Sequence, residues 1–102
     1  MGFIIVYITH KDLKNAKQLC SQLLNKRLIA CANYIPIESA YWWDNKIEND
    51  KEVVSIVKTI PDKWDLLKKT VKRLHPYKTP CIMKFDVEAN KDYEDWIRKQ
   101  TE

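Results

Sequence analysis

The sequence predicts an α+β fold whose strands and helices follow the order βαββαβ, with a further helix at the C-terminus. Three observations predict it: the chain opens with a continuous apolar run, two segments carry apolar residues at helical spacing, and a long segment between them is divided by Asp44-Asn45. A chain of 102 residues suffices for one hydrophobic core, so we expect a single domain over residues 1–102.

The first strand and the first helix are predicted from the N-terminal residues. Phe3–Ile8 reads FIIVYI, which is typical of a central strand covered on both faces. Asp12 has the side chain of a helix N-cap. Lys26 and Arg27 fall in the expected last turn, where positive charge complements the helix dipole. The apolar stripe of this helix is Leu13, Ala16, Cys20, Leu23 and Leu24.

The second and third strands are predicted to form a long hairpin. Leu28–Ile35 is the second strand and continues past Pro36, whereas Lys46–Thr59 returns as the third strand. Between them, Asp44-Asn45 forms a two-residue turn, because both residue types tolerate positive φ.

A second helix, a fourth strand and a terminal helix follow. Thr59–Asp62 has the form of a capping box with proline in the first turn, and His75-Pro76 ends the helix. Cys81–Val87 alternates as the fourth strand, and Asn90 caps the terminal helix. The apolar side of the second helix is Trp64, Leu67, Val71 and Leu74, and that of the terminal helix is Tyr93, Trp96 and Ile97.

This order of elements is the split-βαβ or ferredoxin-like pattern. Right-handed crossovers place both long helices on one face of a four-stranded antiparallel sheet, with the second and fourth strands at its edges. The fold class is therefore α+β, ferredoxin-like, with an extended hairpin of the second and third strands and a C-terminal helix.

The predicted hairpin is longer than the domain that carries it. The third strand has 14 residues, which span about 46 Å at about 3.3 Å per residue, against a diameter of about 34 Å for a 100-residue domain. Pro36 marks where the second strand leaves the domain's own sheet, since proline is tolerated only at an edge or a bulge. Beyond it, Tyr41, Trp42 and Trp43 carry more apolar surface than monomers tolerate. Either another copy of the chain covers these rings or the hairpin folds back on its own helices; we expect self-association.

Six segments carry a family resemblance that spans essentially the whole chain. RLIACANYIP, YWWDNKI, KEV, VKT, LHPYKTP and DYEDWI resemble, in order and spacing, the CutA divalent-cation tolerance family. The resemblance implies a ferredoxin-like fold, a homotrimer built through extended hairpins, a cytoplasmic location and a link to tolerance of divalent metal ions, copper in particular. It also implies kinship with PII-type signalling trimers, so a small-molecule-binding signalling trimer is the alternative function.

Two residues are candidate metal ligands, and no cofactor is expected to be obligatory. The resemblance places the ligands of some bacterial members at Ile8, Leu74 and His75, of which only His75 is a metal-binding type. Cys31 offers a thiolate for copper if a neighbouring subunit supplies a second ligand; otherwise it is a small buried strand residue. His75 either binds copper or zinc through its imidazole or caps the last carbonyls of the second helix.

An intersubunit cleft is predicted on the hairpin. A lysine and a glutamate flanked by aromatic side chains can bind a small anion or position a metal-bound ligand, or they form an ion pair across the interface. The predicted cleft residues are Tyr41, Trp42, Trp43, Glu52 and Lys58.

Composition and motifs exclude several other classes of function. The net charge of +4 comes mainly from residues 58–78 and is typical of a solvated helix face, although a nucleic-acid or small-anion site has the same signature. An RNA-binding module of this topology needs aromatic rings on the third strand, where VVSIV has none, so we expect no nucleic-acid partner. GxSxG, HExxH and phosphate-binding glycine loops are missing from a chain whose sole glycine is Gly2, so we expect no enzyme.

Cellular location is predicted from hydropathy and cysteine usage. No apolar run approaches the roughly 18 residues of a membrane span, and FIIVYI lacks the flanks of a signal peptide. The odd number of cysteines, Cys20, Cys31 and Cys81, without CxxC spacing indicates free thiols in a reducing compartment. We therefore expect a cytoplasmic protein with no membrane partner.

Overall fold

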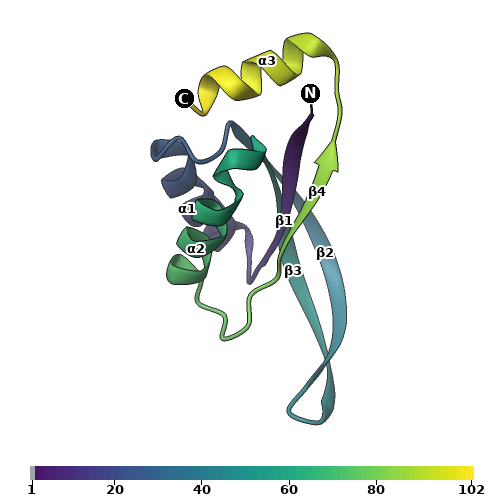
Figure 1. Cartoon of the computed structure of the whole chain (residues 1–102). Helices are drawn as coiled ribbons and strands as arrows, with labels where there is room; N and C mark the ends of the chain where they lie inside the picture. Colours follow the sequence, from purple (N-terminus) through teal and green to yellow (C-terminus); the bar gives the residue numbers. More distant parts are fainter. Residues whose placement is uncertain (1) are drawn as a thin grey trace.

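The strands and helices of the computed structural model, which describes residues 2–102, follow the predicted order (Figure 1). The predicted βαββαβ succession and the terminal helix are confirmed, with one short 3-10 helix, η1, added before α2. The elements are β1 (Phe3–His10), α1 (Leu13–Asn25), β2 (Cys31–Trp43), β3 (Lys46–Thr59), η1 (Pro61–Lys63), α2 (Trp64–Leu74), β4 (Ile82–Val87) and α3 (Lys91–Gln100).

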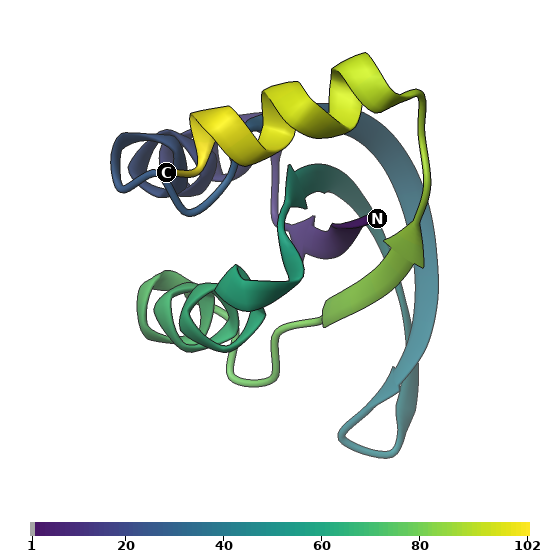
Figure 2. The ribbon, with the colours of Figure 1, turned by 45° about the horizontal axis from the view of Figure 1, so that its top comes forward.

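The four strands form one antiparallel sheet in the order β2-β3-β1-β4. β1 and β3 are central and β2 and β4 lie at the edges, as predicted from the handedness of the crossovers. Figures 1 and 2 show α1 and α2 on the same side of the sheet and α3 across one end of it. None of the helices in residues 2–102 is long and apolar enough to cross a membrane.

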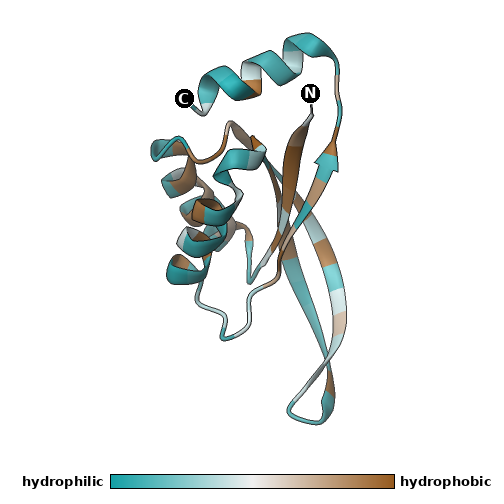
Figure 3. Ribbon diagram, in the orientation of Figure 1, coloured by the Kyte–Doolittle hydropathy of each residue, from teal (hydrophilic) through white to brown (hydrophobic). Residues whose placement is uncertain are grey.

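The hydrophobic core lies between the sheet and helices α1 and α2. Alternate residues of β1, namely Ile4, Val6 and Ile8, are fully buried on the helix side. Figure 3 shows this apolar character in brown along β1 and in patches of α1 and α2. The helices contribute Leu19, Cys20, Leu23, Leu67 and Val71 to the same cluster.

Among residues 2–102, no helix covers the middle of the second face of the sheet. The prediction that β1 is covered on both faces is therefore wrong for a single chain. Across the middle of this face the register places the buried Val54 and six apolar side chains that stay at least partly exposed, and we call the surface formed by these six the open face. Three of them, Ile35, Met83 and Phe85, are 43%, 43% and 47% exposed. The open face consists of Ile5, Tyr7, Ile35, Ile56, Met83 and Phe85.

Helix α1 begins as predicted and ends earlier than predicted. Asp12 is the N-cap, and its Oδ1 accepts the backbone N–H of Asn15 at 2.8 Å. The helix ends at Asn25, so Lys26 and Arg27 lie beyond its last turn. Arg27 adopts φ 60°, the left-handed conformation in which Schellman caps end helices. In that cap, Arg27 N–H donates to Leu24 O and Leu28 N–H donates to Leu23 O, both at 3.0 Å.

The predicted side-chain caps of the other two helices are wrong. The Thr59 side chain lies on the helix side of β3, beside Ile4, where its buried hydroxyl has no hydrogen-bond partner in the described part of the chain. Its place in the strand therefore overrides the capping-box pattern, and only the proline in the first turn is confirmed. Asn90 holds the N-cap position of α3 without a side-chain bond; instead, the Glu94 carboxylate accepts the N–H of Ala89 at 2.7 Å.

The β2-β3 hairpin extends beyond the rest of the sheet, as predicted. Pro36 pairs with Val53, and Val53 pairs with His10, the last residue of β1. The hairpin continues past this point to Asp44 and Asn45, whose φ angles of 50° and 61° are those of a type I′ turn. The molecule measures 45 × 23 × 22 Å, so the hairpin does not fold back on the helices.

Candidate functional site

A cleft lies where the hairpin leaves the sheet, opposite the loop that joins α2 to β4. Its volume is about 740 Å³, within the range of small-molecule sites. The hairpin contributes Tyr41, Trp43 and Glu52, and β1 and the loop complete the walls with Tyr7, Tyr77 and Lys78. Glu38 also lines the cleft, so aromatic rings from three parts of the chain surround two acidic side chains and one basic side chain.

Two tyrosine hydroxyls hold carboxylates at this cleft. Tyr77 Oη donates to Glu52 Oε2 at 2.7 Å, which ties the loop to the hairpin, and Tyr41 Oη donates to Asp50 Oδ2. The hydrogen bond to Asp50 raises the pKa of Tyr41 to about 12. Burial, followed by the hydrogen bond to Glu52, raises the pKa of Tyr77 well above its usual value. Both phenols therefore stay protonated and act as donors at neutral pH.

The structure brings three of the five predicted cleft residues together. Tyr41, Trp43 and Glu52 line the cleft of the single chain. Trp42 points to the opposite side of the hairpin and is 72% exposed, because successive strand residues alternate faces. Lys58 lies six residues from Glu52 along β3, about 20 Å away at the usual strand rise.

Sequence reasoning missed the wall of the cleft formed by the loop. Tyr77 and Lys78 belong to the LHPYKTP segment, which contributed to the family resemblance without being assigned to the cleft. That segment was the available signal. Nothing in the sequence showed that this loop would face residue 52, because the hydrogen-bonded pair is separated by 25 positions.

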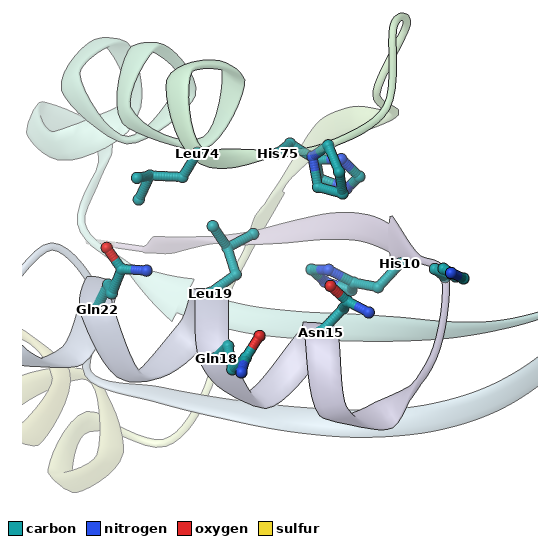
Figure 4. Close-up of a pocket in the computed structure, with 9 residues that line it drawn as sticks. His10, Asn15, Gln18, Leu19, Gln22, Leu74 and His75 are labelled. Atoms are coloured by element: carbon teal, nitrogen blue, oxygen red, sulfur yellow. The ribbon is translucent and has the colours of Figure 1, made fainter.

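Two buried histidines lie beside the cleft, at a smaller cavity of about 80 Å³ (Figure 4). Figure 4 shows His10 and His75 near the end of α2, with Asn15 projecting from α1 below them. The rings stack with centroids 5.5 Å apart and planes 20° from parallel. His10 Nε2 lies 2.7 Å from Ser55 Oγ, at hydrogen-bonding distance. Burial, and secondarily the neighbouring His75, lowers the pKa of His10 to about 4, so His10 is neutral at neutral pH.

Both ring nitrogens of His75 are occupied. The backbone N–H of Tyr77 donates to Nδ1 at 3.1 Å, so Nδ1 carries no proton. Nε2 lies 2.7 Å from the carbonyl oxygen of Thr9, which can only accept, so the ring proton is on Nε2. His75 would therefore have to release one of these partners before it could bind a metal ion.

The single chain does not bring Cys31 and His75 together. Cys31 Sγ lies 3.4 Å from Tyr93 Oη. Cys31 pairs with Lys58 on β3, which in turn pairs with Ile5 on β1. The partner of His75, Thr9, is four residues further along β1, or about 13 Å. In residues 2–102, no three His, Cys, Asp or Glu side chains are grouped so that they could hold a metal ion.

Comparisons with known proteins place the chain among divalent-ion tolerance proteins. The model of the family described as CutA1 divalent ion tolerance protein matches residues 4–100. The divalent-cation tolerance protein CutA of Pyrococcus horikoshii is 48% identical over 99 residues, which make up 96% of this chain and 97% of that protein.

Solved structures show the same fold. The crystal structure of CutA1 from Pyrococcus horikoshii matches with a TM-score of 0.94 and 46% identity, over 97% of this chain and 98% of that one. A structure from Archaeoglobus fulgidus, described as a periplasmic divalent cation tolerance protein, matches over 100% of both chains with a TM-score of 0.93 and 41% identity. The predicted ferredoxin-like fold is thereby confirmed.

Proposed function

Because the chain belongs to the CutA1 divalent ion tolerance protein family, we propose that it acts in tolerance of divalent metal ions as a non-enzymatic homotrimer. The observation that carries the proposal is the amount of apolar surface that a single chain leaves uncovered. The open face exposes Ile35, Met83 and Phe85, and the hairpin exposes Trp42 and Ile47. Other copies of the chain are the partners that we propose to cover these residues.

Light scattering coupled to size-exclusion chromatography tests the trimer. We expect a mass about three times the 12.2 kDa of one chain, unchanged on dilution through the micromolar range. Burial of apolar surface contributes about 25 cal/mol per Å², so the surface covered in the trimer would stabilise the assembly by several kcal/mol per chain. A 12.2 kDa species at micromolar concentration would overturn the proposal.

We propose that copper binds weakly through Cys31, with a second ligand from a neighbouring subunit. Cys31 lies on the same side of β2 as Ile35, so assembly through the open face brings neighbouring chains toward its thiol. We expect Cys31→Ser to abolish copper binding in calorimetric titration and the half-buried control Cys81→Ser to leave it unchanged. Equal binding by both variants would assign the ion to other ligands. A ligand role for His75 stays a prediction, and His75→Ala in the same titration tests it.

We propose a cytoplasmic location because all three cysteines are free thiols. Cys20, Cys31 and Cys81 are all unpaired in the structure, which suits a reducing compartment. Fractionation of cells that express the protein tests the location, and recovery in an oxidising compartment would contradict it.

A second candidate function is that of a small-molecule-binding signalling trimer of the PII type. The 740 Å³ cleft favours it, because aromatic walls with a few charged groups are typical of ligand sites. Glu52 and Lys78 would orient a charged ligand there. Quenching of Trp43 fluorescence by added metabolites, compared with a Trp43→Phe control, tests this function.

A further inference from the structure

We propose that His75 is a positioning residue of the cleft, whose imidazole holds the loop after α2 so that Tyr77 reaches Glu52. The functional value of this role rests on the proposed ligand binding in the cleft, whereas the role itself rests on contacts within one chain. It assigns His75 a task other than metal ligation or helix capping.

The loop depends on side chains for its attachment to the sheet. Pro76 ends α2 and has no N–H to donate. Within the described chain, residues 76–80 make no backbone-to-backbone hydrogen bond outside the helices and strands. The imidazole of His75 supplies the missing link, because Nδ1 accepts the N–H of Tyr77 while Nε2–H donates to the carbonyl of Thr9. One ring thus joins the loop backbone to the central strand β1.

The orientation of this ring is fixed by packing against two neighbouring rings. His75 is 8% exposed and stacks on His10, which is itself 2% exposed and hydrogen-bonded to Ser55. The His75 ring also meets the ring of Tyr77 at 4.6 Å between centroids, with an interplanar angle of 61°. The imidazole therefore has little freedom to turn, and the Tyr77 backbone that it holds is placed with the same precision.

This placement determines the form of the cleft wall. With its backbone held, Tyr77 directs its hydroxyl to Glu52 Oε2 at 2.7 Å. Lys78 follows directly and lines the same cleft. A wall held in place before binding costs less conformational entropy when a ligand enters. Loss of the imidazole bond should therefore loosen Tyr77 and Lys78 without opening the hydrophobic core, because the core cluster includes neither His75 nor Tyr77.

Two substitutions separate the two hydrogen bonds of the ring. His75→Asn places a carbonyl oxygen close to the position of Nδ1, so it can still accept the N–H of Tyr77. His75→Gln places an amide donor close to the position of Nε2, so it can still bond to Thr9 but not hold the loop. Amide hydrogen exchange at Tyr77, followed by NMR in the full chain, reports the loop bond directly.

We expect the Tyr77 amide to exchange about tenfold faster in His75→Gln than in the natural chain, as a lost hydrogen bond worth about 1.4 kcal/mol predicts. His75→Asn should retain the slow exchange. Tyr77→Phe, which removes only the hydroxyl, should also retain it. In the natural chain, ¹⁵N shifts of His75 should show the tautomer with its proton on Nε2.

Equal exchange in His75→Asn and His75→Gln, or a His75 tautomer with its proton on Nδ1, would overturn the positioning role. Light scattering and copper titration on the same samples report the trimer and the metal site separately. A chain that does not form a trimer, or that does not bind copper, would count against the proposed function. Exchange rates measured on an intact trimer bear only on the positioning role.

Discussion

Ile35→Glu is expected to convert the oligomer into single chains. Ile35 lies on edge strand β2 and belongs to the open face, where it is 43% exposed in one chain. In the proposed trimer a neighbouring chain covers it, so a glutamate there would bury a carboxylate without a partner. Such burial costs several kcal/mol, and about 4 kcal/mol corresponds to a roughly thousandfold weaker association.

Light scattering over a dilution series measures this effect. Leu66→Glu is the matched control, because Leu66 lies on α2 and is 54% exposed. It introduces the same charge at a similarly exposed leucine on a helix rather than on the open face, so its mass should stay that of the natural protein. Circular dichroism would verify that both variants keep their fold. An Ile35→Glu protein with an unchanged mass at nanomolar concentration would rule out the open face as the interface.

Acidification is expected to destabilise the folded protein through His10. Burial, together with the adjacent His75, lowers the pKa of His10 from 6.5 to about 4. The unfolded chain therefore takes up a proton between these two pH values while the folded chain does not. By linkage, the stabilisation from His10 is fully present above pH 6.5 and is lost as the pH falls toward 4, by up to about 3 kcal/mol.

Urea unfolding of the natural protein and of His10→Gln, at one fixed chain concentration, measures this contribution. Glutamine does not titrate, and it can keep a hydrogen bond to Ser55. The surface carboxylates titrate equally in both proteins, so only the difference between the two stability curves reports His10. That difference should change by about 3 kcal/mol between pH 6.5 and 4. Parallel curves over this interval would show that His10 is not the buried neutral base.

Elements with a strong local pattern were predictable. β3 has the predicted bounds, because the apolar run VVSIV and the Asp44-Asn45 turn both depend on neighbouring residues. α2 ends at Leu74, as predicted from His75-Pro76, since proline cannot continue the helix. The level at which the hairpin outgrows the sheet also coincides with Pro36, because Pro36 pairs with Val53 and Val53 pairs with His10, the last residue of β1.

Predictions that depended on distant partners were less successful. Thr59 fits a capping pattern, yet its place in β3 turns the hydroxyl into the core. His10 was given no role from the sequence, because Ser55 and His75, its partners, lie 45 and 65 positions away along the chain. Cys31 and His75 share metal-binding chemistry, but their positions at opposite ends of the sheet are not visible in their spacing.

By itself, the sequence determined the order of strands and helices, the length of the hairpin and its surplus of exposed aromatic rings. These properties depend on periodicity, turn chemistry and chain length, all of which are local. The tertiary structure alone decided which polar atoms meet: Tyr77 with Glu52, His75 with Thr9, and His10 with Ser55. Such contacts require an accuracy of a few tenths of an ångström between segments far apart in the chain, and only the packed core and the strand register position those segments so closely.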